Sequence, residues 1–214
     1  SLYINTDASS LIGSDTFENG EVKLRKGPIL NCAIKGGFGV LDEINMAKNE
    51  SLAVLHAVLD FRRTIDLPGY DRINLHEATR FIGTMNYGYA GTREMNEALA
   101  SRFMVLHMPV ISAENLQKLI KDKYPTLKPE YISQFATLFD EIRKKCEGGE
   151  ISTRSLDLRG LISCIGMMKK GLGVTKALEM GLINKCFDEY ERQLVLDIVS
   201  ARLPESLSGE SIFS

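Results

Sequence analysis

Two adjacent carboxylates, Asp42 and Glu43, directly follow the apolar segment 38–41, and a helical pattern begins immediately after them. A buried parallel strand delivers the residues that follow it to the carboxyl edge of an α/β sheet, where ligands bind. At such an edge one carboxylate can hold Mg²⁺ beside a nucleotide, while its neighbour orients an attacking water. The alternative interpretation is a strand that ends in an acid pair capping the next helix. The rest of the chain has to decide between the two.

Other patterns that could bind a metal are incomplete. The four cysteines form no C-x-x-C pair, and the three histidines are scattered along the chain. His76 and Glu77 resemble the start of H-E-x-x-H, but Arg80 stands where the second histidine is needed. A zinc site is therefore not expected, and the cysteines are expected to be reduced and buried, as in a cytosolic protein.

The composition sets the size and the class of protein. A chain of 214 residues suits one large domain, or a domain with a smaller companion. With 26 basic and 28 acidic residues, the charge gives no reason to expect nucleic acid or an anionic membrane as a partner. No apolar run is long enough to span a bilayer, and no signal-like segment opens the sequence. We therefore expect a cytoplasmic protein with no membrane partner.

The first half of the chain has the patterns of an α/β fold. Short apolar strands are expected at 38–41, 81–86 and 104–108. Helices are expected at 49–60 and 94–101, and a hairpin or strand pair around 20–30 should lead into a short helix. A Pro-Gly turn between two alternating runs predicts a second hairpin within 63–75.

From residue 112 onward the patterns are helical. Helices are expected at 112–123, 130–146, 152–170, 174–180 and 186–203. The predicted fold is thus α/β: a parallel sheet with flanking helices over residues 1–110, followed by a small all-helical domain over 111–203. A Ser/Gly-rich flexible tail is expected at 204–214.

Four short segments, in this order and spacing, resemble the AAA+ ATPases, and more narrowly their MoxR-like, dynein-related branch. They are Val-Leu-Asp-Glu at 40–43, Thr-Met-Asn at 84–86, Ala-Ser-Arg-Phe at 100–103 and Ser-Thr-Arg-Ser-Leu at 152–156. The two predicted hairpins also lie where this branch carries its helix-2 insert and its pre-sensor-1 hairpin. The resemblance covers nearly the whole chain and implies a partial AAA+ core followed by a helical lid.

The resemblance also implies a role for each segment's polar residue. Asp42 takes the Mg²⁺ position of the Walker B strand, and Glu43 the position that activates water. Asn86 corresponds to sensor 1, whose amide reaches toward the γ-phosphate or its water. Arg102 corresponds to the arginine finger, which enters a neighbouring subunit's site, and Arg154 to sensor 2 at the start of a lid helix. ATP and Mg²⁺ are the implied cofactors.

Each segment also has an interpretation that involves no function. A strand that ends in asparagine is common, and Ser-Arg-Phe is usually a helix end with a solvated arginine. Arg154 near a helix start is mildly unfavourable, because the N-terminal end of the helix dipole prefers anions. This placement is expected if an anionic ligand lies nearby, and a surface salt bridge is the alternative.

One departure from the family pattern concerns the phosphates. The sequence contains no G-x-x-x-x-G-K-[ST], and the glycines at 171–176 have the wrong spacing and suit a turn between helices. The resemblance places the phosphate-binding loop before Ser1, on a strand between those at 81–84 and 104–108. The chain is then either the C-terminal portion of a longer ATPase or a subunit that has lost hydrolysis, and the intact acidic side favours the first. We expect the gap to be closed by a second chain or by rearranged pairing, or 104–108 to be detached from the sheet.

The first functional hypothesis is an ATPase that couples hydrolysis to the remodelling or maturation of a protein partner, as a MoxR-type chaperone. The resemblance implies a homo-oligomeric ring, a hexamer, and a client that carries a von Willebrand A domain. One alternative is a subunit of a GTP-driven motor of the restriction type. Another is a non-catalytic ring or interaction module.

Overall fold

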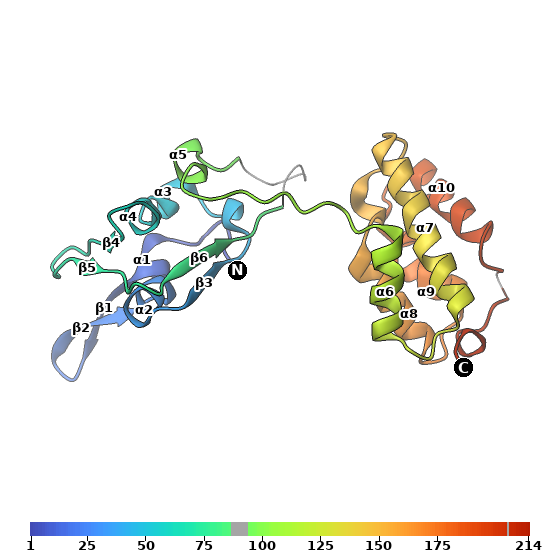
Figure 1. Ribbon diagram of the computed structural model, residues 1–214, viewed down its shortest axis with the longest axis horizontal. Helices are drawn as coiled ribbons and strands as arrows, with labels where there is room; N and C mark the ends of the chain where they lie inside the picture. Colours follow the sequence, from blue (N-terminus) through green and yellow to red (C-terminus); the bar gives the residue numbers. More distant parts are fainter. Residues whose placement is uncertain (87–93, 205) are drawn as a thin grey trace. The chain divides into compact units, whose positions relative to one another are not determined.

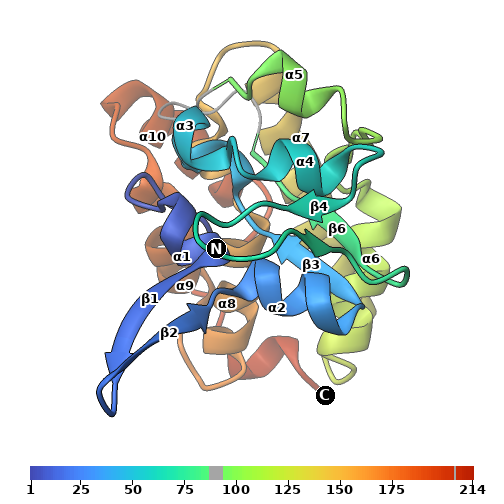
Figure 2. The same cartoon turned by 90° about the vertical axis from the view of Figure 1, so that its left-hand side faces the viewer.

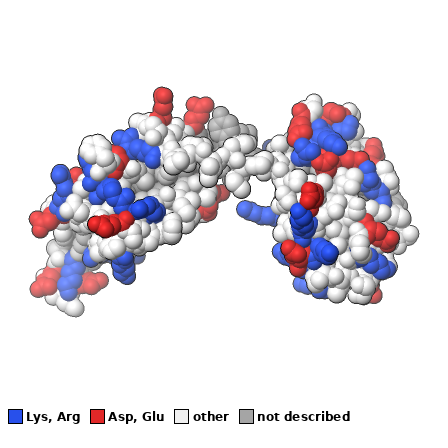
Figure 3. Space-filling view, in the orientation of Figure 1, with Lys and Arg blue, Asp and Glu red and all other residues white. Residues whose placement is uncertain are grey.

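The computed structural model describes residues 1–86, 94–204 and 206–214. The chain divides into two compact units, residues 1–107 and residues 108–214 (Figure 1). Each unit has its own cluster of buried apolar side chains, and each is described by itself below. Acidic and basic side chains are interspersed on the visible face of both units (Figure 3), as the nearly balanced charge predicts.

The first unit is built on two parallel strands, β3 (Phe38–Leu41) and β6 (Arg80–Gly83), which lie side by side in Figure 2. Their register places Gly39 opposite Phe81 and Leu41 opposite Gly83. A Cβ atom on Gly39 would lie 2.6 Å from the Phe81 ring, so only glycine allows the ring to lie across β3. The predicted pairing of the two strands, parallel and adjacent, is confirmed.

Short helices and two antiparallel hairpins surround this pair. They are α1 (Ala8–Ile12), β1 (Gly13–Glu18), β2 (Glu21–Lys26), α2 (Pro28–Lys35), η1 (Ile44–Met46), α3 (Asn49–Leu52), α4 (Leu55–Leu59), β4 (Thr64–Ile65), β5 (Ile73–Asn74) and α5 (Glu97–Ala100). The hairpin predicted around 20–30 begins earlier, because Asn19 and Gly20 both adopt positive φ and form its two-residue turn. The hairpin predicted within 63–75 is confirmed, and the helix predicted at 49–60 is divided into α3 and α4.

The strand predicted at 104–108 is wrong. These residues form no helix or strand, and the side chains of Met104, Leu106 and Met108 are 97%, 84% and 81% exposed. In the described part of the chain β6 pairs only with β3, and no described strand lies next to 104–108. A strand needs a partner as well as an apolar pattern, and this segment has none. Detachment of 104–108 was one of the outcomes expected without the phosphate-loop strand.

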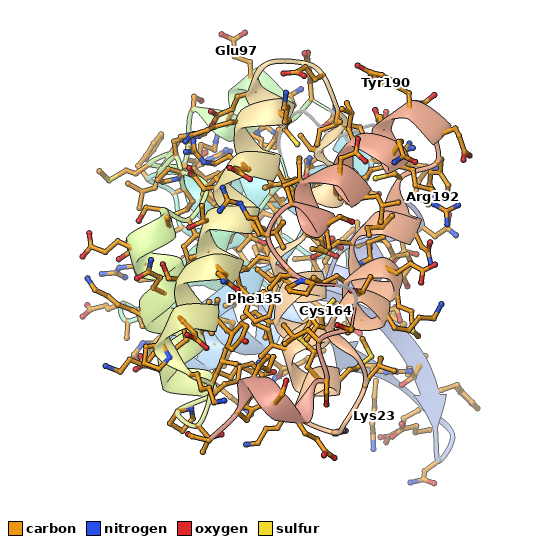
Figure 4. The ribbon with its side chains drawn as sticks, turned by 90° about the vertical axis from the view of Figure 1, so that its right-hand side faces the viewer. Lys23, Glu97, Phe135, Cys164, Tyr190 and Arg192 are labelled. Atoms are coloured by element: carbon orange, nitrogen blue, oxygen red, sulfur yellow. The ribbon has the colours of Figure 1, made fainter. Side chains whose placement is uncertain are left out.

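The second unit is helical. It contains α6 (Ala113–Lys123), α7 (Pro129–Glu147), η2 (Thr153–Ser155), α8 (Leu158–Met168), α9 (Val174–Gly181), η3 (Ile183–Lys185), α10 (Glu189–Ser200) and η4 (Glu210–Ile212). Phe135 and Cys164 lie in its interior, among the helices (Figure 4). The helix predicted at 152–170 is divided, because Asp157 accepts a hydrogen bond from Gly160 N–H (3.0 Å) and so begins α8 anew.

The end of the chain, for which the sequence predicts a flexible tail, is packed on the second unit. Ile212 is fully buried, and Phe213 forms a β-bridge with Leu127. The Lys128 N–H donates to the carbonyl of Ile212 (3.0 Å). Two apolar side chains at the C-terminus, Ile212 and Phe213, thus supply the burial that the Ser/Gly-rich pattern before them does not suggest.

Helices α8 and α9 approach so closely that Gly181 has no room for a side chain. A Cβ atom there would lie 2.1 Å from Cys164 Sγ and 3.2 Å from the Gly160 carbonyl oxygen. We expect Gly181→Ala to lower the free energy of unfolding by about 1–3 kcal/mol, because overpacking forces the helices apart. Urea unfolding checks this, with Gly173→Ala as the control, where the nearest atom would be 4.0 Å away. Equal losses in the two variants would contradict the close contact.

Candidate functional site

The carboxyl edge of β3 and β6 brings together the residues that follow the two strands. Thr84 Oγ1 donates a hydrogen bond to Asp42 Oδ1 (2.6 Å) and accepts one from the Glu43 N–H (3.2 Å). The Ile44 N–H donates to the Thr84 carbonyl (2.9 Å), which extends the contact beyond the strands. One threonine hydroxyl therefore connects both members of the acid pair to the end of the neighbouring strand.

Glu43 stands at a sharp turn of the backbone. Its φ of 57° and ψ of 45° lie in the left-handed region, which costs a residue other than glycine about 1–2 kcal/mol. The turn is held because the next residue, Ile44, is buried and hydrogen-bonded to Thr84. Such conformations persist where the surrounding structure enforces them, and they are concentrated at functional sites. The acid pair therefore ends the strand at a fixed bend and does not cap a regular helix.

A second link reaches Asn86. Asn45 is only 4% exposed, and its Nδ2 donates to the Asn86 carbonyl oxygen (2.9 Å). Its Oδ1 is buried and has no hydrogen-bond partner in the part of the chain that the structure describes. A buried acceptor without a donor is unfavourable and marks a place where a polar group can be received. The structure thus brings Asp42, Glu43 and Asn86 to one edge, as predicted.

Sequence reasoning missed Thr84 and Asn45 as connecting residues. Thr84 had a signal, since it directly follows the apolar segment 81–83 as Asp42 directly follows 38–41. Asn45 had a weaker one: it is a polar residue between Ile44 and Met46, where an apolar side chain would suit burial better.

The residues near Ser1 also contact this edge. The Leu2 N–H donates to the Asp42 carbonyl (2.8 Å), and Ser1 Oγ donates to Asp42 Oδ2. The exposed Asp42 carboxylate offers oxygen atoms, which are the ligands that Mg²⁺ prefers. Among the described residues no group of three or more His, Cys, Asp or Glu side chains could hold a metal. The donor set fits an ion that one carboxylate shares with phosphate and water, and it does not fit a cage made of protein ligands alone.

Arg102 lies just after α5 and is held within its own unit. Its guanidinium donates to the His56 carbonyl (3.3 Å) and to the Ala98 carbonyl, and it forms an ion pair with Asp60 (3.6 Å). The side chain is 25% exposed. Its predicted role in a neighbouring subunit would require at least some of these bonds to be exchanged.

Asp60 serves two arginines. Both of its carboxylate oxygens accept hydrogen bonds from Arg62, at 2.5–3.1 Å, while Arg102 lies farther away. The hydrogen-bonded Arg62 guanidinium, and to a smaller extent the charge of Arg102, lower the pKa of Asp60 to about 2. The carboxylate therefore remains charged at all ordinary pH values and can anchor Arg102 continuously.

Arg154 lies in the second unit, in the single turn η2 and not on the first turn of α8 as predicted. Asp157 is the residue that directly precedes α8, and its side chain caps the helix. Arg154 is exposed, and its guanidinium lies 5.0 Å from the centre of the Phe187 ring.

Sequence comparisons relate the chain to known proteins. The AAA domain of the dynein-related subfamily matches residues 2–103. A Staphylococcus aureus protein, SAB1265c of strain bovine RF122 / ET3-1, is 32% identical over 202 residues, which cover 92% of this chain and 76% of that protein. YojN of Bacillus subtilis (strain 168) is 30% identical over 200 residues, covering 91% of this chain and 66% of that protein.

A crystal structure of a protein from Cytophaga hutchinsonii ATCC 33406 covers 92% of this chain and 58% of that protein, with 16% identity and a TM-score of 0.44.

The chain belongs to the dynein-related subfamily of the AAA-type ATPases. It combines part of the AAA+ α/β core with a helical part. The chain spans about two thirds to three quarters of the length of the relatives it matches. In the described residues no helix is long and apolar enough to cross a membrane.

The bridging role of Thr84 can be tested by substitution. Thr84→Val keeps the shape but removes the hydroxyl, so the Glu43 N–H loses its acceptor and Asp42 loses a donor. We expect a loss of about 1 kcal/mol in the free energy of unfolding and faster hydrogen exchange at the Glu43 amide. Thr84→Ser keeps the hydroxyl, so its Glu43 amide should exchange at the wild-type rate. An unchanged Glu43 exchange rate in Thr84→Val would contradict the bridge.

The anchoring role of Asp60 has a pH signature. Because its pKa in the folded protein is lowered to about 2 from an ordinary value of 3.8, its stabilising contribution is present above about pH 4 and is lost as the pH falls toward 2. The unfolding midpoint of Asp60→Asn should therefore lie below that of the wild type at pH 7, and the difference should shrink between pH 4 and 2. Asp66→Asn is the control, since Asp66 pairs with Arg72 at the surface (2.6 Å) and its loss should matter little. A pH-independent difference for Asp60→Asn would contradict the assignment.

Proposed function

We propose that the protein to which this chain belongs hydrolyses ATP and uses the reaction to remodel or mature a protein partner, as a MoxR-type AAA+ ATPase. The observation that carries the proposal is the parallel register of β3 and β6. This register places Asp42, Glu43 and Asn86 at one sheet edge, connected by Thr84 and Asn45. Membership of the AAA-type ATPase family supports it.

The residues at the edge have separate tasks in this proposal. Asp42 would hold Mg²⁺, directly or through water; when bound, the ion supplies positive charge to the phosphate oxygens. Glu43 orients the attacking water from the bend at which the strand ends. Asn86 offers its side-chain amide to the γ-phosphate or the water, while Asn45 fixes its backbone. Arg102 and Arg154 stabilise the charge that develops on the transferred phosphoryl group.

The phosphate-binding loop is proposed to lie on a strand that precedes Ser1 and pairs with the outer edge of β6. Two features of the described residues support this. First, β6 pairs on one side only. Second, one face of the strand pair exposes Phe38, Val40 and Ile82, whose side chains are 74%, 62% and 46% exposed. Exposed strand edges and contiguous apolar surface are features that folded proteins usually cover.

A ring of identical subunits follows from the proposed role of Arg102, since a finger acts across a head-to-tail contact. The family resemblance implies that this ring is a hexamer. In the described structure Arg102 is anchored to Asp60 and two carbonyls, so assembly would have to draw it away from at least part of that anchor. The proposed client is a protein, one with a von Willebrand A domain, and the proposed location is the cytoplasm.

Two other functions remain as outcomes of the test. A restriction-type motor would prefer GTP over ATP. A non-catalytic ring or interaction module would bind no nucleotide productively.

The catalytic assignments are tested in a protein that carries the preceding segment with its phosphate-binding loop. Glu43→Gln should bind ATP but nearly abolish phosphate release, because the amide keeps the shape of the side chain and loses its charge. Arg102→Ala should lower kcat by roughly 10³-fold or more with little change in nucleotide binding.

Two controls make the result specific. Glu50→Gln changes an exposed glutamate of the same unit and should leave turnover unchanged. Arg62→Ala removes the other arginine bound to Asp60, so it reports any loss caused by disturbing that anchor. Wild-type turnover in Glu43→Gln would refute the assigned chemistry, and faster turnover of GTP would favour the motor. No turnover in the wild type, with the loop present, would favour the non-catalytic module.

A further inference from the structure

The turn that carries Arg154, residues 152–155, is hydrogen-bonded to a carboxylate from a distant part of the second unit. Glu191 Oε1 accepts a hydrogen bond from the Ser152 N–H (2.9 Å), and Glu191 Oε2 accepts one from Ser152 Oγ (2.8 Å). The two donors of Ser152 are thus bound by the two carboxylate oxygens of Glu191, which lies 39 positions farther along the chain. Hydrogen bonds to a charged acceptor are about twice as strong as neutral ones, and two parallel bonds fix direction as well as distance.

Glu191 is itself held in place. It lies on the first turn of α10, and its own N–H donates to the side chain of Asp188, the residue that caps this helix (3.0 Å). Asp188 thereby fixes the start of the helix from which the Glu191 carboxylate reaches Ser152. The grip on Ser152 therefore comes from a capped helix and not from a loose loop.

The other end of the turn is anchored by burial. Ser155 is fully buried, and its Oγ lies 2.8 Å from Cys186 Sγ, at hydrogen-bond distance. Ile151, which precedes the turn, is 4% exposed. Thr153 and Arg154, between these anchors, are both exposed. The backbone on either side of Arg154 is therefore fixed, while its side chain remains accessible to a ligand.

The side chain of Arg154 is guided by Phe187. The guanidinium lies 5.0 Å from the centre of the ring, within the range of a cation–π contact. Phe187 is 83% exposed, so burial of the ring contributes little to the stability of the unit. An aromatic ring in that position limits the directions open to a long, flexible side chain. Cys186, Phe187 and Glu191 thus set both the backbone and the guanidinium of Arg154 from one short stretch of chain.

We propose that Glu191 is a positioning residue for Arg154: it fixes the turn so that the guanidinium, aligned by Phe187, is presented to the phosphate charge. The proposal rests on the role given to Arg154 under the proposed function. A purely structural Glu191 would only tie α10 to the 152–155 turn, and its loss would lower stability without affecting Arg154 in particular.

The first test follows Arg154 directly and needs no nucleotide. In the whole chain labelled with ¹⁵N-arginine, the Arg154 Nε–H resonance is assigned by its loss in Arg154→Ala. Wild-type protein should show an ordered Nε–H with a ring-current shift that disappears in Phe187→Ala. Glu191→Ala should reduce both the order parameter and the shift of the Arg154 resonance, because both hydrogen bonds from Ser152 to the Glu191 carboxylate are lost. Unchanged Arg154 signals in folded Glu191→Ala would overturn the proposal.

Three further variants separate positioning from general stability. Glu191→Gln should retain the Arg154 signals, because its amide can accept from the Ser152 N–H and donate to Ser152 Oγ. Glu189→Ala, on the same turn of α10 and exposed, should leave them unchanged. Should Glu191→Ala fail to fold, Ser152→Ala removes only the hydroxyl bond and should give a partial loss of order. An order parameter in Ser152→Ala equal to that of the wild type would then count against the grip.

The second test measures turnover in the protein with its phosphate-binding loop. Glu191→Ala should lower kcat by roughly 10- to 100-fold with little change in KM, because displacement of a group that acts in the transition state has this effect. Adding Glu191→Ala to Arg154→Ala should cause no further loss, since both act through one guanidinium. A further tenfold loss would overturn the proposal. Wild-type turnover of Arg154→Ala would instead refute the catalytic role of Arg154, and the resonance measurement alone would then decide whether Glu191 positions it.

Discussion

The parallel register between β3 and β6 is the constraint on which the candidate site depends. With Leu41 opposite Gly83, the next residues on each strand, Asp42 and Thr84, emerge beside one another at the same edge. A shift of one position would reverse the faces on which the side chains lie and would carry Thr84 away from Asp42. The hydroxyl bridge, the bend at Glu43 and the link from Asn45 to Asn86 all follow from this pairing.

That register is secured by packing on one face only. On the side toward α2, Gly39 leaves room for the Phe81 ring, and Leu41 is buried. On the other side, Phe38, Val40 and Ile82 remain exposed, and the outer edge of β6 is unpaired in the described structure. The first unit therefore combines a well-determined acidic edge with apolar surface and backbone groups that could pair with a further segment. The two features are consistent with a nucleotide site of which this chain supplies the acidic side.

The arginines show how the surroundings of a side chain define what it can do. Arg102 and Arg154 both lie at short helical turns, and the sequence does not show what either side chain contacts. Arg102 is bound by a carboxylate and two carbonyls of its own unit, so using it elsewhere would cost the bonds that have to be broken. Arg154 rests on an exposed ring, and the hydrogen bonds that fix its turn are made by its neighbours, so its own donors can meet a ligand without such an exchange.

The sequence by itself determined the class of fold, the parallel pair of strands and the position of Asp42, Glu43 and Asn86 at one edge. The apolar segment that ends in the acid pair indicated the strand before Asp42 and Glu43, and the resemblance to the AAA+ ATPases implied the neighbouring strand and the position of Asn86. It also placed most helices of the second unit, because their apolar spacing and caps are local signals.

Only the tertiary structure decided the conformation of residues 104–108, which residues contact Arg102, and how the C-terminus packs. The apolar run at 104–108 predicted a strand, but a strand forms only where a neighbouring edge accepts its hydrogen bonds. Asp60 meets Arg102 from 42 positions away, and Glu191 meets Ser152 from 39, distances at which no sequence periodicity relates two residues. Local patterns fix local structure; contacts between distant segments depend on how the whole chain packs, and that choice is made by the summed burial and hydrogen bonding of many residues at once.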